Sequence, residues 1–130
     1  MNMEIFTSNR YFTVFDYLVS HGQLLIRSDK RKGYASNIDI IFFDTQFIQL
    51  FTMLNGIKIS IINTPQSHQY PTVSKYLSYD NNHLFEVESE GIIYYIAASF
   101  VKVFENNLEF NETSLGFDQK GRQRELFSSI

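Results

Sequence analysis

Apolar residues occur along this chain in short runs that are rich in Ile, Val, Phe and Tyr, and Gly, Asn, Asp and Ser separate the runs. Runs of β-branched and aromatic residues bounded by turn-forming residues are typical of strands. The pattern therefore predicts a mostly β fold, in which antiparallel meanders and hairpins form a sandwich or a partly open barrel with at most one or two short helices. An α+β fold is the alternative.

The first hairpin is predicted to turn at His21, Gly22 and Gln23. β-Prone runs lie on both sides of this turn, "YFTVFDYLVS" before it and "LLIRSD" after it. Glycine adopts the positive φ angles that a tight turn requires. A helix over residues 8–21 is the alternative, because the apolar residues of this stretch also share one helical face and Gly22 would cap its end.

Two further strands are predicted in the first half of the chain. The segment "NIDIIFFD", residues 37–44, carries apolar side chains on both faces, which indicates a central strand covered on both sides. In "GIKISII", residues 56–62, isoleucines alternate with Lys58 and Ser60, which indicates a strand with one face in solvent.

The stretch between these two strands has the spacing of a helix. Phe47, Leu50, Phe51 and Leu54 recur at intervals of three and four residues, and Gly56 follows where a helix would end. The sequence leaves two interpretations of residues 45–54 open: the one substantial helix of the chain, or a strand.

The second half of the chain begins with the longest predicted loop, residues 63–74, which contains both prolines. Residues 75–80 and 83–89 then predict a hairpin that turns at Asn81 and Asn82, because asparagine tolerates left-handed backbone conformations.

The rest of the second half predicts a meander within a single domain, residues 1–130. A strand over residues 92–105 is followed by a turn at the asparagines 106 and 107 and a strand over residues 108–117. A helix over residues 97–105 is the alternative to the end of the first of these strands. Residues 119–130 predict a flexible polar tail or a short frayed helix.

Composition narrows the classes of function. At 130 residues with 44% hydrophobic residues, the chain has enough apolar surface to form a core without metals or disulfides. It contains no cysteine, which excludes disulfides, thiolate metal sites and cysteine nucleophiles. We expect no cofactor. We also expect no membrane association and a cytoplasmic location, since neither a signal sequence nor an apolar run of membrane-spanning length is present.

The charges are distributed unevenly. The net charge is −3, yet seven of the eleven basic residues lie in two segments, 27–32 and 120–124, and the stretch between Gly33 and Asp118 has ten acidic residues and three lysines. Because an acidic surface repels nucleic acid, we expect a basic protein partner and no nucleic acid. The cluster Lys30 to Lys32 would suit a polyanion only if the tail arginines lay beside it.

Several residue types of catalytic and metal sites occur, but not in productive arrangements. Ser20, His21 and Asp29 belong to the types of a hydrolase triad, yet neighbours on a strand point to opposite faces. The three histidines, His21, His68 and His83, are too far apart in sequence for two ligands on one side of an element. We therefore expect no enzymatic activity and no catalytic, cofactor-binding or metal-binding residues.

Glu86 and Glu88 alternate with Phe85 and Val87, so both carboxylates lie on one face of a strand. This spacing is compatible with the carboxylate pair of a glycosidase. It is explained without further assumptions by the polar outer face of a sheet.

Tyrosines accompany these carboxylates, five of them between residues 70 and 95. Tyrosine offers a large contact area at a small entropic cost and is common at protein interfaces. We expect the chain to be a protein-binding module, of the kind represented by an immunity or antitoxin-type inhibitor of a basic toxin. The residues expected to bind the partner are Tyr79, Glu86, Glu88, Glu90, Tyr94 and Tyr95.

Two alternatives to this function remain open from the sequence. A β-barrel-like protein could bind a small apolar ligand in a cavity walled by residues 38–43 and 92–98. The partner could also be a second copy of the chain, which would make the protein a homodimer.

Overall fold

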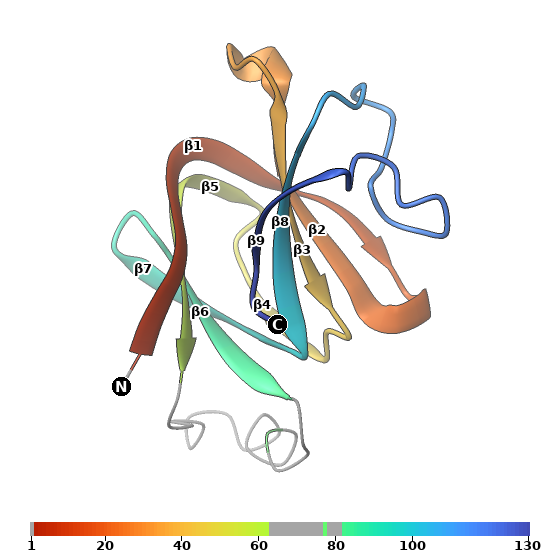
Figure 1. Ribbon diagram of the computed structural model, residues 1–130. Helices are drawn as coiled ribbons and strands as arrows, with labels where there is room; N and C mark the ends of the chain where they lie inside the picture. Colours follow the sequence, from red (N-terminus) through yellow and green to blue (C-terminus); the bar gives the residue numbers. More distant parts are fainter. Residues whose placement is uncertain (1, 63–76, 78–81) are drawn as a thin grey trace.

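The computed structural model describes residues 2–62, residue 77 and residues 82–130, and Figure 1 shows its strands. All nine strands belong to one antiparallel sheet that does not close into a barrel. The strands are β1 (Asn2–Leu18), β2 (Gln23–Ser28), β3 (Asn37–Phe43), β4 (Phe47–Gln49), β5 (Met53–Ile62), β6 (His83–Ser89), β7 (Ile92–Ala98), β8 (Phe100–Asn106) and β9 (Arg124–Ser128). The prediction of a mostly β fold is confirmed.

Helical structure in these ranges is limited to short pieces. Two 3₁₀ turns occur, η1 (Ser20–Gly22) between β1 and β2 and η2 (Lys30–Lys32) between β2 and β3. No helix within the described residues is long and apolar enough to cross a lipid bilayer.

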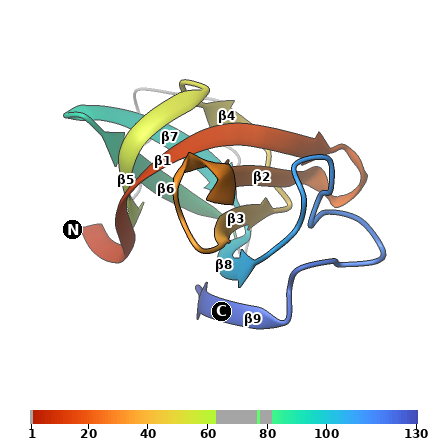
Figure 2. The same ribbon diagram turned by 90° about the horizontal axis from the view of Figure 1, so that it is seen from above.

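The long strand β1 joins the two halves of the sheet, whose strand order is β4-β7-β6-β5-β1-β2-β3-β8-β9. Residues 2–13 of β1 pair with β5, and residues 13–18 pair with β2. Figure 2 shows β1 running across both halves. One half therefore consists of β4, β5, β6 and β7, and the other consists of β2, β3, β8 and β9.

The interior between the two halves is filled by apolar side chains. Phe42 of β3 and Phe85 of β6 are fully buried, and their rings meet edge to face with centroids 5.4 Å apart. Burying such a side chain contributes about 1.5–3 kcal/mol. The strands that we expected to wall a ligand cavity, residues 38–43 and 92–98, thus contribute side chains to a packed interior.

The hairpin predicted at His21 and Gly22 is confirmed, and the alternative helix over residues 8–21 does not form. Both residues have positive φ, 64° and 53°. A Cβ atom on Gly22 would lie 2.9 Å from the backbone nitrogen of Thr45, so this position has no room for a side chain. His21 and the basic residues of η2 lie at opposite ends of β2, as expected.

Of the two interpretations of residues 45–54, the helix does not form. The backbone nitrogen of Thr45 donates to Gly22 O at 2.9 Å, and that of Gln46 donates to Ala97 O at 2.8 Å. The chain then pairs with β7 as β4 and turns into β5. Hydrogen bonds to distant strands therefore outweigh the local helical spacing, since helix propensity is a weak preference that tertiary context overrides.

The single strand predicted over residues 92–105 is interrupted at Ser99. Its two parts, β7 and β8, lie in opposite halves of the sheet and do not pair with each other. The Ser99 backbone nitrogen donates to Phe43 O at 3.0 Å, and its hydroxyl donates to Asp44 Oδ2 at 2.9 Å. These contacts fix the crossover, so neither the predicted meander nor the alternative helix over residues 97–105 is present.

The C-terminal part also differs from the prediction. Residues 108–117 do not form a strand but belong to a long loop, residues 107–123, that follows β8. The tail predicted over residues 119–130 contains β9, which pairs with β8. The polar sequence of the tail does not by itself predict this edge strand, because the hydrogen bonds that form it come from the distant strand β8.

Some predicted features fall outside the described residues. These are the loop over residues 63–74, and nearly all of the strand over residues 75–80. They also include His68, Tyr70, Tyr76 and Tyr79.

Candidate protein interface

The strand register places Glu86 and Glu88 on the outer face of the half that contains β4–β7. Phe85 and Val87 are fully buried in the interior, and successive side chains of a strand point to opposite faces. The predicted common face of the two carboxylates therefore follows from the register. This face lies away from the interior between the two halves.

Cross-strand neighbours on this face form rows, and the first row runs through Glu88 across β5, β6 and β7. Lys58 of β5 lies directly opposite Glu88 on one side, and Ile93 of β7 lies opposite it on the other. The Lys58 Nζ atom is 3.6 Å from Glu88 Oε1, and both side chains are well exposed. Ile93 is 41% exposed, which is high for an isoleucine on a sheet.

The second row crosses four strands at Glu86. Ser60 of β5 and Tyr95 of β7 are its neighbours, and Glu4 of β1 lies opposite Ser60. The backbone nitrogen of Tyr95 donates to Gln49 Oε1 of β4 at 3.2 Å. We call the set Glu4, Glu86, Glu88, Ile93 and Tyr95 the acidic face.

The remaining residues expected to bind a partner lie elsewhere. Tyr94 pairs with Val87 and packs against the interior, so it is not on the acidic face. Glu90 has a φ of 51° and forms the turn between β6 and β7 together with Gly91. Tyr79 lies outside the described residues.

The half of the sheet that contains β4–β7 carries more negative than positive charge. Lys58 is the one arginine or lysine on strands β4, β5, β6 and β7, whose described residues also carry Glu86 and Glu88. Glu4 and Glu90 add two further carboxylates at the border of the half. A surface of this sign attracts cationic groups and repels polyanions. We call β4–β7 the acidic half.

The outer face of the other half is covered by the loop of residues 107–123, which appears in blue beside β2 in Figure 2. Leu115 of this loop packs against Leu25, Ile41 and Phe104. We call β2, β3, β8 and β9 the capped half.

A buried ion pair lies under this loop. Arg27 and Asp39 are 1% and 0% exposed, and two hydrogen bonds of 2.7 and 2.9 Å join them. The Ser114 hydroxyl and the Asn106 amide also donate to Asp39 Oδ2, at 2.7 and 3.0 Å. The third guanidinium nitrogen of Arg27, Nη1, donates to Glu112 O at 2.8 Å. Because protein groups satisfy this pair on every side, its role is to hold the loop onto the sheet.

Arg122 fastens the far end of the loop. It donates to Ser114 O at 2.7 Å and to Gln23 Oε1 at 2.9 Å. Burial lowers the pKa of Arg122, and the nearby Asp39 carboxylate opposes this shift.

The basic cluster of η2 is engaged within the chain. The Lys30 ammonium donates to Asn107 O at 2.8 Å, and the Arg31 guanidinium lies 3.8 Å from the centroid of the Phe110 ring. Lys32 lies 5.4 Å from the ring of Tyr11. Tyr34, considered as a stacking surface for a polyanion, is stacked by Arg10 at 3.8 Å.

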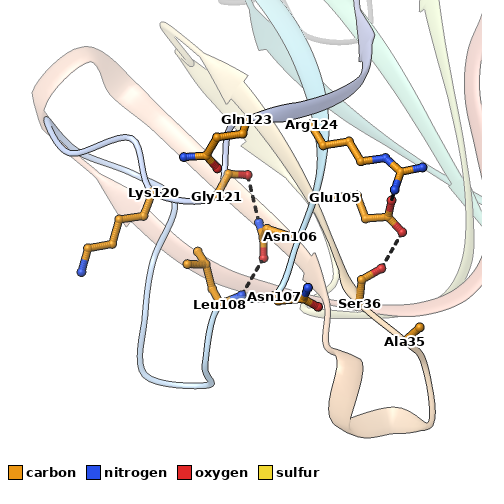
Figure 3. A pocket seen from close by; sticks show the side chains of 10 residues that line it. All are labelled: Ala35, Ser36, Glu105, Asn106, Asn107, Leu108, Lys120, Gly121, Gln123 and Arg124. Atoms are coloured by element: carbon orange, nitrogen blue, oxygen red, sulfur yellow. Dashed lines mark hydrogen bonds and ion pairs between the residues drawn. The ribbon is translucent and has the colours of Figure 1, made fainter.

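The C-terminal segment does lie beside the loop that follows η2, the one arrangement expected to enlarge a basic patch. An open groove of about 750 Å³ separates them, lined on one side by Ala35 and Ser36 and on the other by Lys120, Gly121, Gln123 and Arg124 (Figure 3). Arg124 is paired with Glu105 at 2.8 Å, and Ser36 also donates to Glu105. Lys120, the other cation of the lining, is 3.8 Å from Glu112, so both cations that line this groove are paired and neither is left to hold a polyanion.

The residues of the sequence-level triad are separated. Ser20 and His21 lie in η1, and Asp29 lies beyond the other end of β2. Burial alone would raise the pKa of Asp29, but hydrogen bonds from the Arg31 side chain and backbone outweigh it and lower the pKa. Asp29 thus caps the basic turn.

The histidines are also apart. His83 Nδ1 is engaged by Ser99 O at 2.8 Å, whereas His21 lies in η1, where its carbonyl oxygen accepts from the Asp44 backbone nitrogen at 3.0 Å. In the parts of the chain that the structure describes, no three histidine or acidic side chains are grouped closely enough to hold a metal ion.

Three residues of this outer face, namely Glu4, Lys58 and Ile93, were not identified from the sequence. The alternation of "GIKISII" places Lys58 on a solvent face, but nothing local shows that this face continues onto β6. The register between distant strands makes the connection. The residues of this chain carry the functional argument by themselves, since no protein-family model, curated protein or solved structure matches it.

Proposed function

We propose that this protein is a non-enzymatic protein-binding module that recognises a basic segment of its partner through the acidic face. One observation carries this proposal: the register aligns Glu4, Glu86 and Glu88 on one outer face beside Tyr95 and Ile93. Carboxylates steer a cationic partner and set its orientation, while an aromatic and an aliphatic side chain supply contact area.

The packing of the molecule supports a binding role over a role in chemistry or ligand storage. The interior between the halves is filled with side chains such as Phe12, Phe42 and Phe85, each fully buried. Every buried side-chain nitrogen or oxygen within the described ranges has a hydrogen-bond partner. An immunity-type inhibitor, which neutralises a basic toxin by covering it, is a protein of this description.

The experiment that tests the proposal is affinity capture from the native organism, followed by binding measurements with the captured protein. The double variant Glu86→Lys/Glu88→Lys is compared with the wild type. We expect the captured protein to be basic, and the double variant to bind it at least about tenfold more weakly, since like charges across an interface cost several kcal/mol. Raised salt is expected to slow association with the wild type.

A matched control separates the effect of reversing charges on the acidic face from the effect of changing the net charge of the protein. Glu109→Lys/Asp118→Lys changes the net charge equally, but both residues are exposed on the loop of the capped half. This variant should bind like the wild type. Equal weakening by both double variants, unchanged binding by the first, or the absence of any captured protein would each contradict the proposal. Circular dichroism and thermal melting verify that the variants are folded.

A further inference from the structure

The N-terminal part of β1 has one bare edge. Residues 2–13 pair with β5 on one side, whereas β2 pairs only with residues 13–18 on the other. Near the middle of β1, Arg10 closes the second side with its side chain, which donates to Ser28 O and Ser36 O at 3.2 and 2.6 Å. The backbone edge from residue 3 to residue 7 therefore has no strand beside it among the described residues.

The strand β9 has a bare edge as well, because it is the last strand of the sheet and pairs only with β8. The Ser129 backbone nitrogen donates to Val101 O at 3.0 Å, so it points toward β8. Successive N–H groups of a strand alternate in direction. The N–H of Ser128, which is paired in register with Lys102, therefore points away from β8 to the open edge.

These two bare edges border the same groove. Its volume is about 370 Å³, and residues 3–5 form one wall while residues 127–129 form the other. Ile5, Ile61 and Phe127 line it, and all three pack against the interior cluster. The groove therefore lies between the last strand of the sheet and the part of β1 that pairs on one side only.

The groove is continuous with the acidic face. Glu4 lines the groove, and it is the one charged residue that does so within the described parts of the chain. The same residue begins the row that runs through Ser60 to Glu86. A segment lying in the groove therefore meets the carboxylate of Glu4 as its nearest charged side chain.

We propose that this groove accepts an extended, basic segment of the partner protein as an additional strand between β1 and β9. This inference rests on the proposed function, and it adds the mode of binding. Bare strand edges present N–H and C=O groups at the spacing of an extended backbone, which is the chemistry of strand addition. Alternate apolar side chains of the segment would lie over Ile5, Ile61 and Phe127, and a lysine or arginine of the segment would lie beside Glu4.

The test uses a phage-displayed library of short random peptides selected on the full-length wild-type chain. We expect enrichment of peptides with alternating β-branched residues and flanking lysine or arginine. Ser128→Pro removes the outward N–H from an edge position where proline is tolerated. It should weaken an enriched peptide about tenfold, which corresponds to about 1.4 kcal/mol. Ser128→Ala, the matched control, keeps the N–H and should bind like the wild type.

A second variant and a second measurement guard against misfolding of the proline variant. Glu4→Lys should also weaken the enriched peptide. Hydrogen exchange of the wild type should show protection of the amides of residues 3–7 and of Ser128 when peptide is added. Peptides that bind Ser128→Pro and Glu4→Lys as tightly as the wild type, protection elsewhere, or no enrichment would each overturn the inference.

Other occupants of the groove would be recognised without peptide. Protection of residues 3–7 that grows with protein concentration would assign the groove to a second copy of this chain. Protection that is independent of concentration would assign it to a segment of the same chain. Both results overturn the inference. If the captured partner is sensitive to Glu86→Lys/Glu88→Lys but not to Ser128→Pro, the groove mode fails while the proposed function stands. If the captured partner is sensitive to Ser128→Pro but not to Glu86→Lys/Glu88→Lys, the proposed role of the acidic face fails instead.

Discussion

The two outer faces of this one sheet accommodate charged strand residues in opposite ways. On the capped half, charged residues at strand positions are buried under the loop of residues 107–123, where Arg27 and Asp39 satisfy each other. On the acidic half, Glu86 and Glu88 occupy equivalent positions, yet lie on a face with a single lysine on its strands. Whether a polar side chain on a strand is buried or exposed therefore depends on what packs over that part of the sheet.

The energetic consequences of the two arrangements differ. A buried pair that loses one partner leaves an uncompensated charge in the interior, which is strongly destabilising. An exposed pair such as Lys58 and Glu88 contributes little, because water screens it and both side chains lose freedom. Charges of the capped half should therefore affect folding, and charges of the acidic face should affect binding.

The largest effect is expected for Asp39→Ala. It removes the partner of Arg27 and the acceptor of Ser114 and Asn106. We expect the free energy of unfolding to fall by about 3–5 kcal/mol. Urea denaturation measures the loss. A decrease as small as that of Glu86→Gln, which we expect to stay within about 0.5 kcal/mol, would contradict the contrast between the two faces.

A smaller effect is expected for Ser114→Ala, which breaks one hydrogen bond between the loop and Asp39. Hydrogen bonds to charged groups contribute about 1.5–3 kcal/mol, so the free energy of unfolding should fall by this amount. Hydrogen exchange should also accelerate in residues 107–123 before it does so in β6 and β7. Uniform acceleration across both halves would show that the loop is not fastened at this point.

A smaller effect still is expected for Glu88→Gln. The change removes the exposed pair with Lys58 but keeps the shape of the side chain. The free energy of unfolding should fall by about 0.2–1 kcal/mol, and the decrease should be smaller at high salt. Thermal melting at low and high salt measures this, and a loss comparable to that of Asp39→Ala would place Glu88 in a structural rather than a binding role.

The smallest effect concerns the pH dependence of the basic turn. Because the pKa of Asp29 is lowered in the folded protein, its stabilising contribution is present above the ordinary aspartate pKa of 3.8 and is lost as pH falls through the lowered value. The difference in stability between the wild type and Asp29→Asn should therefore be constant near neutral pH and shrink in acid. Denaturation at a series of pH values tests this, and a difference that grows in acid would contradict it.

The fold class and several elements could be predicted from local pattern. The alternation in residues 56–62 and the apolar run in residues 37–43 required strands, and Gly22 marked a turn that the structure confirms through its positive φ and its close approach to Thr45. The shared face of Glu86 and Glu88 also followed, because the direction of side chains on a strand has a period of two residues.

The candidate site could be predicted only in part. Glu86, Glu88 and Tyr95 share the acidic face, but Tyr94 faces the interior although it is adjacent to Tyr95 in sequence. Glu4 joined the site through the pairing of β1 with β5, which connects residues far apart along the chain. No local signal at Glu4 distinguishes it from an ordinary exposed glutamate.

By itself, then, the sequence determined that the chain forms strands, where the first hairpin turns, and which carboxylates share a face, because these depend on the alternation of neighbouring residues. The tertiary structure decided that residues 45–54 contain β4 and the start of β5, that the chain crosses between halves at Ser99, and that Arg27 and Asp39 are buried together. Each of these depends on hydrogen bonds between distant residues, such as Gln46 to Ala97 and Ser99 to Phe43. Those bonds exist only once the sheet has assembled, so no pattern within one segment contains them.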